Sequence, residues 1–238
     1  MQVHLPKPLH GWRALAGEVG IIVLGVLIAL GAGQLAEYLQ HRSEAREARA
    51  SIQAELEINM ARLASRSAQR GCVQHRLAEI QALLDHAAAD GTIVTPQWVG
   101  RPQFWTMQTV RWDAVSQAGR AALLPPKELA DYGLMYTIMR NITGVMTTEQ
   151  ADWGRLRSLE HMRRLTPEMV FELNGLLQDA RYMDWRIAVW TGQLKPSEAE
   201  LHLTKLPNEL RASQAACVPM STPRDRAVRE SNPDIGEP

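Results

Sequence analysis

The sequence is poor in cysteine, in lysine and in phenylalanine, and it carries no net charge. Its two cysteines, Cys72 and Cys217, lie far apart and form no Cys-x-x-Cys pair. Lys plus Arg and Asp plus Glu balance at 26 each, so no net field attracts nucleic acid or an acidic surface. No segment alternates as a strand does, and no repeat with a period of about 20–50 residues is present. Nucleic-acid partners, sheets and repeat architectures are therefore not expected.

Catalytic and metal-binding motifs are missing as well. There is no His-Glu-x-x-His, no Glu-x-x-His, no Gly-x-Ser-x-Gly and no Walker loop. The pairs His75 with Glu79 and Glu198 with His202 have the i, i+4 spacing of two metal ligands, but no further ligand pattern accompanies them. Solvated surface pairs explain them better. We therefore predict no metal, no cofactor and no enzymatic activity.

One long apolar run stands out against this background. Residues 19–33 contain no charged or hydrogen-bonding side chain, and extension to residues 14–36 adds only Glu18 and Gln34 as polar residues. At the helical rise this longer segment reaches about 34 Å, enough to cross the hydrocarbon core of a bilayer. The sequence predicts a single transmembrane helix over residues 14–36.

A cleaved signal peptide is the main alternative, because Lys7 and Arg13 precede the apolar run. Three features favour a retained anchor. Glu18 stands where a signal peptide stays positive, no Ala-x-Ala follows, and the chain continues past Gln34 as a strong helix. A buried helix of a soluble protein is the third reading, but such a helix seldom lacks polar residues on every face.

Small residues recur along one side of the predicted span. Gly25, Ala29 and Gly33 fall at i, i+4 and i+8, a spacing that lets two membrane helices approach closely. One interpretation is that two copies of the chain associate through this face. The other is that glycine and alanine are simply common in membrane helices.

The segment Gly17–Leu30 resembles the start of an uncharacterised family of bacterial membrane proteins. That family opens with a short basic tail containing Trp, then an acidic residue, then an apolar run ending in Gly-Val-Leu-Ile-Ala-Leu; Trp12, Glu18 and residues 25–30 match. Gln34 and Tyr38 replace the Asn or Asp and the Trp that follow in the family. The resemblance covers about the first fifth of the chain. It implies a bacterial inner-membrane anchor, a tail on the inside and a helical, periplasmic domain of unknown function.

Charge alone does not decide which side of the membrane holds the domain. Basic residues flank the span on both sides, namely Lys7 and Arg13 before it and Arg42, Arg46 and Arg49 after it. An even number of cysteines is compatible with an oxidising compartment. Cys72 and Cys217 either pair as a disulfide or are two unrelated small apolar residues, and the sequence leaves both open.

After the span the chain is predicted to be helical throughout. No Gly or Pro occurs between Gln34 and Gly71, so the anchor is expected to continue as one helix to about residue 89. Apolar residues follow a 3-4 spacing there. Polar residues share the same seam, which disfavours a continuous dimeric coiled coil and favours packing against the protein's own domain. The seam contains Ile52, Leu56, Asn59, Leu63, Arg66, Arg70, Val73, Leu77, Ile80, Leu84 and Ala87.

Proline and glycine divide the remainder into shorter elements. Asp90-Gly91 is predicted to stop the long helix, and Thr166 to cap a later one. Helices are expected over residues 102–122, 126–162, 166–191, from 197 and over 207–217, and residues 219–238 are expected to be disordered. The predicted organisation is a tail (1–13), a transmembrane helix (14–36), an all-α stalk and bundle (37–218) and a disordered end (219–238).

Tryptophan is abundant relative to the other aromatic residues. Trp105 and Trp112 can share a helical face, whereas Gly100 and Pro102 separate Trp98 from them, and such residues usually belong to a core. The best functional hypothesis is a membrane-anchored interaction or scaffold protein, with lipid, a second copy or envelope proteins as partners. A sensory or ligand-binding module is the alternative. A cavity lined by Trp105, Trp112 or Trp185 would favour that alternative, and one gathering His75, His86 and acids would favour an enzyme.

Overall fold

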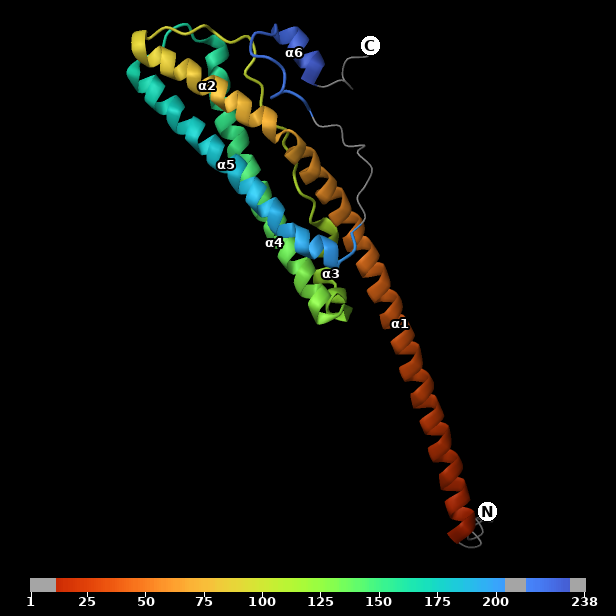
Figure 1. Cartoon of the computed structure of the whole chain (residues 1–238). Helices are drawn as coiled ribbons and strands as arrows, with labels where there is room; N and C mark the ends of the chain where they lie inside the picture. The colour runs from red at the N-terminus through yellow and green to blue at the C-terminus, as the bar shows by residue number, and fades with distance from the viewer. Residues whose placement is uncertain (1–11, 204–212, 232–238) are drawn as a thin grey trace, which may run out of the picture.

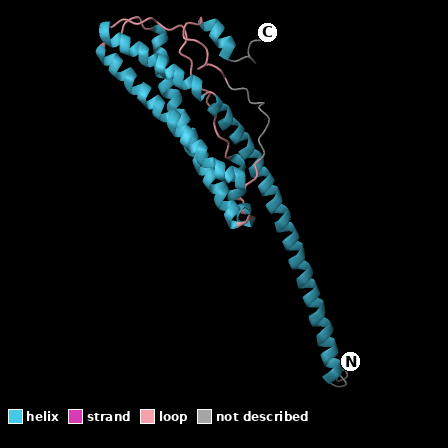
Figure 2. Cartoon of the chain, viewed as in Figure 1, coloured by secondary structure: helices cyan, strands magenta, loops and turns pink. Residues whose placement is uncertain are grey.

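The computed structural model describes residues 12–203 and 213–231. The described part is all-α, as predicted: helices make up nearly all of its regular structure, and Thr92 and Arg164 form an isolated β-bridge (Figure 2). The elements are α1 (Trp12–Ala68), α2 (Arg70–Asp90), α3 (Val110–Gln117), η1 (Arg120–Leu123), α4 (Pro126–Leu156), η2 (Arg157–His161), α5 (Pro167–Glu200) and α6 (Arg224–Ser231).

Helix α1 sets the shape of the molecule. Its first half projects alone from one end of an elongated bundle, and its second half packs along that bundle (Figure 1). At 57 residues it is about 85 Å long. Among the described residues it is the one helix long and apolar enough to cross a membrane, and side chains such as Ile21 and Ile28 are 74% and 64% exposed. The predicted span 14–36 lies within this free half.

The long helix ends earlier than predicted. Instead of reaching residue 89, α1 stops at Ala68, and α2 starts at Arg70 in a new direction. Gln69 lies at the break, where its side-chain Oε1 accepts a hydrogen bond from the Gln103 backbone N–H (3.1 Å). Polar residues that bond to other segments therefore occupy the junction. The predicted stop at Asp90-Gly91 is confirmed, because Gly91 caps α2 with a left-handed φ of 73°.

Helices α4 and α5 form a long antiparallel hairpin. Each has Pro in its first turn, and the Thr166 hydroxyl accepts a hydrogen bond from the Met169 N–H at the start of α5 (3.3 Å). Helix α5 continues to Glu200 through Pro196, so the predicted end near residue 191 and the separate helix from Ser197 are wrong.

The helix predicted over residues 102–122 shrinks to α3 and η1. Most of residues 101–109 run extended because side chains of other helices take their backbone N–H groups. Asn59 on α1 accepts from Gln108 N (2.8 Å), and Thr143 on α4 accepts from Met107 N (3.2 Å). These bonds replace the i→i−4 bonds of a helix.

Two hydrophobic cores fill the bundle. The first core joins the second half of α1 to α3, α4 and the end of α5, and contains Ile52, Leu56, Tyr136, Met139 and Ile187 among others. The second core joins α2 to the end of α4 and the start of α5, and contains Val73, Ile80, Trp153, Leu173 and Leu177 among others. The stalk thus packs on its own domain, as its polar seam predicts.

The C-terminal segment corrects another prediction. The sequence predicts disorder over residues 219–238, but residues 219–231 pack against the bundle and include α6; residues 232–238 lie outside the described part. Val218 and Ala227 bury themselves against Trp98, which supplies an apolar site that composition alone does not reveal. Of the helix predicted over 207–217, residues 207–212 are not described, and residues 213–217 contain no helix, with a turn at 215–217.

Candidate functional site: a buried charged layer and its adjoining hollow

A layer of charged residues separates the two hydrophobic cores. Arg66 near the end of α1 lies between Glu149 on α4 and Asp184 on α5, with Nη2 2.7 Å from Glu149 Oε1 and 3.2 Å from Asp184 Oδ1. The three side chains are 2%, 0% and 4% exposed. Each interrupts an apolar face at the level where α1 passes into α2. We call these three residues the charged layer.

Asp184 also connects the charged layer to α2. Its Oδ2 accepts hydrogen bonds from Arg70 Nε (3.1 Å) and Gln74 Nε2 (3.4 Å). One buried carboxylate therefore receives donors from both sides of the α1–α2 break. Buried ions of this kind need such partners, because their loss of hydration costs several kcal/mol each.

Burial perturbs the acids of this region. It raises the pKa of Glu149 to about 7, and the guanidinium of Arg66 opposes the shift only in part. The Oε2 atom of Glu149 has no hydrogen-bond partner among the described residues. Burial, with Asp179 nearby, also raises the pKa of Asp152 on the next turn of α4. The layer thus contains a carboxyl group that titrates close to neutrality.

A hollow opens onto the charged layer from the surface between α2 and α5. It has a volume of about 220 Å³, and Asp184 forms part of its wall. Trp185, a residue that is 53% exposed, contributes its indole ring. The lining residues are Arg70, Gln74, Leu77, Arg181, Asp184 and Trp185. A buried ion pair and a surface cavity therefore share residues.

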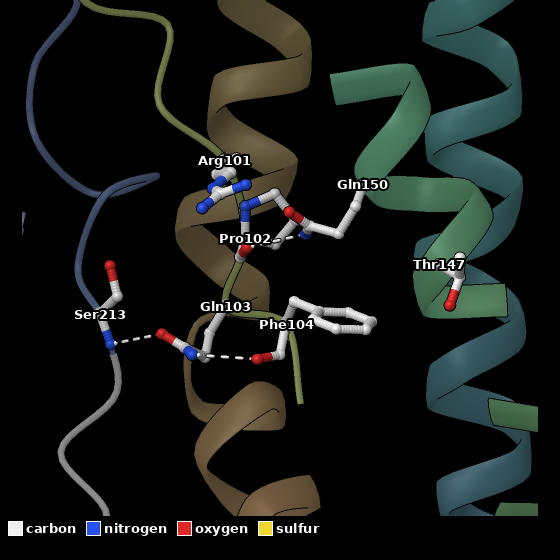
Figure 3. Close-up of a pocket in the computed structure, with 7 residues that line it drawn as sticks. All are labelled: Arg101, Pro102, Gln103, Phe104, Thr147, Gln150 and Ser213. Atoms are coloured by element: carbon white, nitrogen blue, oxygen red, sulfur yellow. Dashed lines mark hydrogen bonds between the residues drawn. The ribbon is translucent and has the colours of Figure 1, made fainter. Parts of the chain in front are cut away.

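A second pocket of about 440 Å³ lies beside the extended connection (Figure 3). Gln103 links this connection to the C-terminal segment, since its Oε1 accepts from Ser213 N (3.0 Å). Gln150 Nε2 on α4 donates to the Pro102 carbonyl (3.0 Å). Arg101, Pro102, Gln103, Phe104, Thr147, Gln150 and Ser213 line the pocket, and Arg101 makes no ion pair with a described residue.

A third, more open groove of about 640 Å³ is mainly apolar. It lies between α2, the connection after α2 and the C-terminal segment, with Leu83, His86, Val94, Pro96 and Met220 in its wall.

No protein-family model matches this chain, and no curated protein or solved structure matches it. The geometry therefore carries the functional argument alone.

The structure joins Cys72 at the start of α2 to Cys217 in the C-terminal segment by a disulfide, with 4.8 Å between the Cα atoms. Arg76, one turn further along α2, reinforces this connection. Its guanidinium is buried and donates to the carbonyls of Trp98, Val99 and Val218. The C-terminal segment is thus fastened by a covalent bond and by a buried cation.

The small-residue face of the span lies on the free half of α1. Gly25, Ala29 and Gly33 are exposed, and a Cβ added at either glycine meets nothing within 4 Å. The face is thus open to a partner, and its predicted self-association stays a prediction.

The other singled-out residues are dispersed. His75 Nε2 lies 3.6 Å from Glu79 Oε1 on the surface of α2, while His86 lies in the third groove. Trp105 and Trp112 pack against the first core, and Trp112 stacks on Tyr136 at 5.1 Å. Within the described ranges, no three His, Cys, Asp or Glu residues are grouped as metal ligands would be.

Of the three residues of the charged layer, the sequence singles out Arg66 alone, together with the adjoining Arg70. Arg66 and Arg70 were conspicuous as cations in an apolar seam, but nothing marked Glu149 and Asp184 as their partners. Each acid occupies a helical position that is otherwise apolar on its own helix, between Met146 and Trp153 and between Ala180 and Ile187. That interruption is the signal that could have revealed them.

Proposed function

We propose that the chain is a single-pass protein of the bacterial inner membrane and acts as a non-enzymatic interaction or scaffold protein, with its bundle in the periplasm. One observation carries the proposal. Helix α1 runs without a break from an exposed apolar segment into the core of the bundle, so an anchor and a folded domain share one rigid element. An apolar segment of this length that covers no core needs lipid around it.

The disulfide supports a periplasmic bundle. Disulfides persist in oxidising compartments and are rare in the bacterial cytosol. The bond between Cys72 and Cys217 therefore favours a bundle on the periplasmic side, whereas the flanking basic residues favour neither side of the membrane.

Exposed side chains support a role in protein contacts. The open small-residue face of the span suits a second copy of α1 in the membrane. On the bundle, Phe171, Tyr182 and Trp185 of α5 are 83%, 52% and 53% exposed. Large aromatic residues are enriched in protein interfaces.

A ligand-binding module is the second candidate, and the hollow beside the charged layer favours it. Trp185 lines that hollow, and Asp184 couples it to Arg66 near the end of α1. A molecule bound there would lie next to the helix that leads to the membrane.

Site-specific labelling tests the proposed topology. In a Cys72→Ser/Cys217→Ser background, Ser116→Cys adds one exposed thiol to the bundle. A matched variant, Gln2→Cys, places the thiol in the tail before the span. We expect a membrane-impermeant maleimide to label Ser116→Cys in intact cells and Gln2→Cys only after lysis. Labelling of Ser116→Cys only after lysis would place the bundle in the cytoplasm and reject the proposal.

The native cysteines provide an independent readout. In the unaltered chain, we expect labelling of Cys72 and Cys217 in intact cells only after reduction. Labelling without reduction would show that the disulfide is absent in the cell, and the topological argument from the disulfide would be lost.

A further inference from the structure

The hollow between α2 and α5 has an unusual balance of charge. Arg70 and Arg181 contribute two guanidinium groups to its wall, and Asp184 is the one carboxylate in its lining. That carboxylate is already shared with Arg66, which bonds to it from inside the bundle (3.2 Å). The wall of the hollow therefore carries more positive than negative charge.

Both guanidinium groups keep donors free. Arg181 Nη1 donates to the neutral Gln81 Oε1 (3.1 Å), and Arg181 forms no ion pair with any described residue. Arg70 uses Nε for Asp184, and its two terminal nitrogens have no partner in the described ranges. Its side chain is 41% exposed. The forked donors of both residues are thus available to an anion, for which guanidinium geometry is well suited.

The rest of the wall consists of Gln74, whose amide already donates to Asp184, and of two apolar side chains. Leu77 and the half-exposed indole of Trp185 lie beside the cations. An indole face and an aliphatic side chain favour a flat or apolar group over a fully hydrated ion. A volume of about 220 Å³ suits a molecule of a few to a dozen heavy atoms and excludes a folded partner.

We propose that this hollow binds a small organic carboxylate. The carboxylate group lies between Arg70 and Arg181, and the apolar part of the molecule rests on Trp185 and Leu77. Bound in this way, the ligand shares Arg70 with Asp184 and so contacts the charged layer through one side chain. The inference does not depend on which side of the membrane the bundle occupies.

Ligand-observed NMR with benzoate tests the proposal on the full chain in detergent micelles. The buffer is a chloride salt without phosphate or other carboxylates, and empty micelles give the background. We expect saturable binding of benzoate to the protein. Arg181→Gln is expected to weaken it by about tenfold or more, the loss that removal of one charge-assisted hydrogen bond brings. Circular dichroism verifies that the variant keeps its helix content.

Arg186→Gln is the matched control, because Arg186 lies on the same helix but outside the lining, over the rings of Tyr182 and Trp190. It is expected to bind benzoate as the unaltered chain does. Trp185→Ala provides a second test at an exposed position and is expected to weaken benzoate binding.

Three results would overturn the proposal. One is the absence of saturable benzoate binding above the micelle background. Another is an equal loss of binding in Arg181→Gln and Arg186→Gln. The third is inorganic phosphate binding as tightly as benzoate, since an apolar wall contributes nothing to phosphate.

Discussion

At the scale of single residues, the charged layer is the most demanding feature of the bundle. A carboxylate or guanidinium in an apolar interior is tolerated only when it is paired with an opposite charge and hydrogen-bonded. Arg66 serves two acids at once, so its loss leaves more than one group without its main partner. Replacement of Arg66 is therefore expected to lower the free energy of unfolding more than replacement of another arginine of α1.

Arg66→Met is expected to lower the free energy of unfolding by about 3 kcal/mol or more, because Glu149 stays buried without a cation and Asp184 keeps only its α2 partners. Urea unfolding followed by circular dichroism measures the loss. Arg46→Met, at an exposed position of the same helix, is the control and should change stability little. A loss in Arg66→Met no larger than in the control would contradict the assigned role.

Glu149 makes stability depend on pH. Burial raises its pKa from 4.5 to about 7, so between about pH 4.5 and pH 7 the folded chain holds a proton that the unfolded chain has released. Stability must therefore fall as pH rises through this window. The glutamine of Glu149→Gln has no proton to lose. The substitution is therefore expected to abolish the fall in the free energy of unfolding, which in the unaltered chain amounts to up to about 3 kcal/mol.

Urea unfolding of both proteins at several pH values measures that difference. Glu47→Gln alters an exposed acid of α1 and serves as the control. Equal pH dependence in the unaltered chain and in Glu149→Gln would contradict the prediction.

At the scale of elements, the sequence predicts those helix ends and starts that adjacent residues determine. Gly91 ends α2, and Thr166 with Pro167 starts α5, because caps and first turns are fixed by adjacent residues. The failures have long-range causes. The extended run after Gly100 exists because Asn59 and Thr143 supply acceptors from distant helices. The order of residues 219–231 rests on Trp98, more than a hundred residues away.

The candidate site follows the same division. Two of its cations were visible as misfits in an apolar seam, whereas the acids that meet them come from α4 and α5. Pairing across four helices is a property of tertiary packing, which a single sequence does not reveal.

Two glycines with left-handed backbones provide a test of how the C-terminal segment docks. Gly100 (φ 68°) and Gly119 (φ 72°) would both be strained by a side chain, at a cost of about 1–3 kcal/mol. Only at Gly100 would the new Cβ also collide with the carbonyl of Ala215. Gly100→Ala is therefore expected to destabilise the protein more than Gly119→Ala.

Thermal unfolding compares the two glycine variants, and hydrogen exchange of residues 213–231 locates the effect. Faster exchange there in Gly100→Ala alone is the expected pattern. Equal destabilisation with unchanged exchange would show that backbone strain, and not docking, accounts for both.

At the scale of the whole molecule, the bundle is joined to the anchor by one continuous helix. About 48 Å of α1 separate Gln34 from Arg66 along the helix axis. Contact between two spans in lipid would therefore also set how two bundles lie relative to each other.

Gly25→Ile is expected to weaken self-association in membranes by about tenfold, because a branched side chain prevents close approach of the small-residue face. Gly31→Ile adds the same side chain on the opposite side of the helix and should leave association unchanged. Energy transfer between labelled copies in liposomes measures the equilibrium. Equal weakening of association in both variants would show that two copies do not meet through the face of Gly25, Ala29 and Gly33.

The disulfide also closes a covalent ring between Cys72 and Cys217, which are 145 positions apart, and the ring includes most of α2 and all of α3, α4 and α5. A protease that cuts once inside this ring, for example in the extended connection, opens the loop without releasing a fragment. Both pieces remain attached to α1, and a nicked chain migrates as one species on a denaturing gel until a reductant is added. Cleavage before Cys72 has the opposite result, since it breaks the covalent link between the anchor and the rest of the chain in a single step, with or without a reductant.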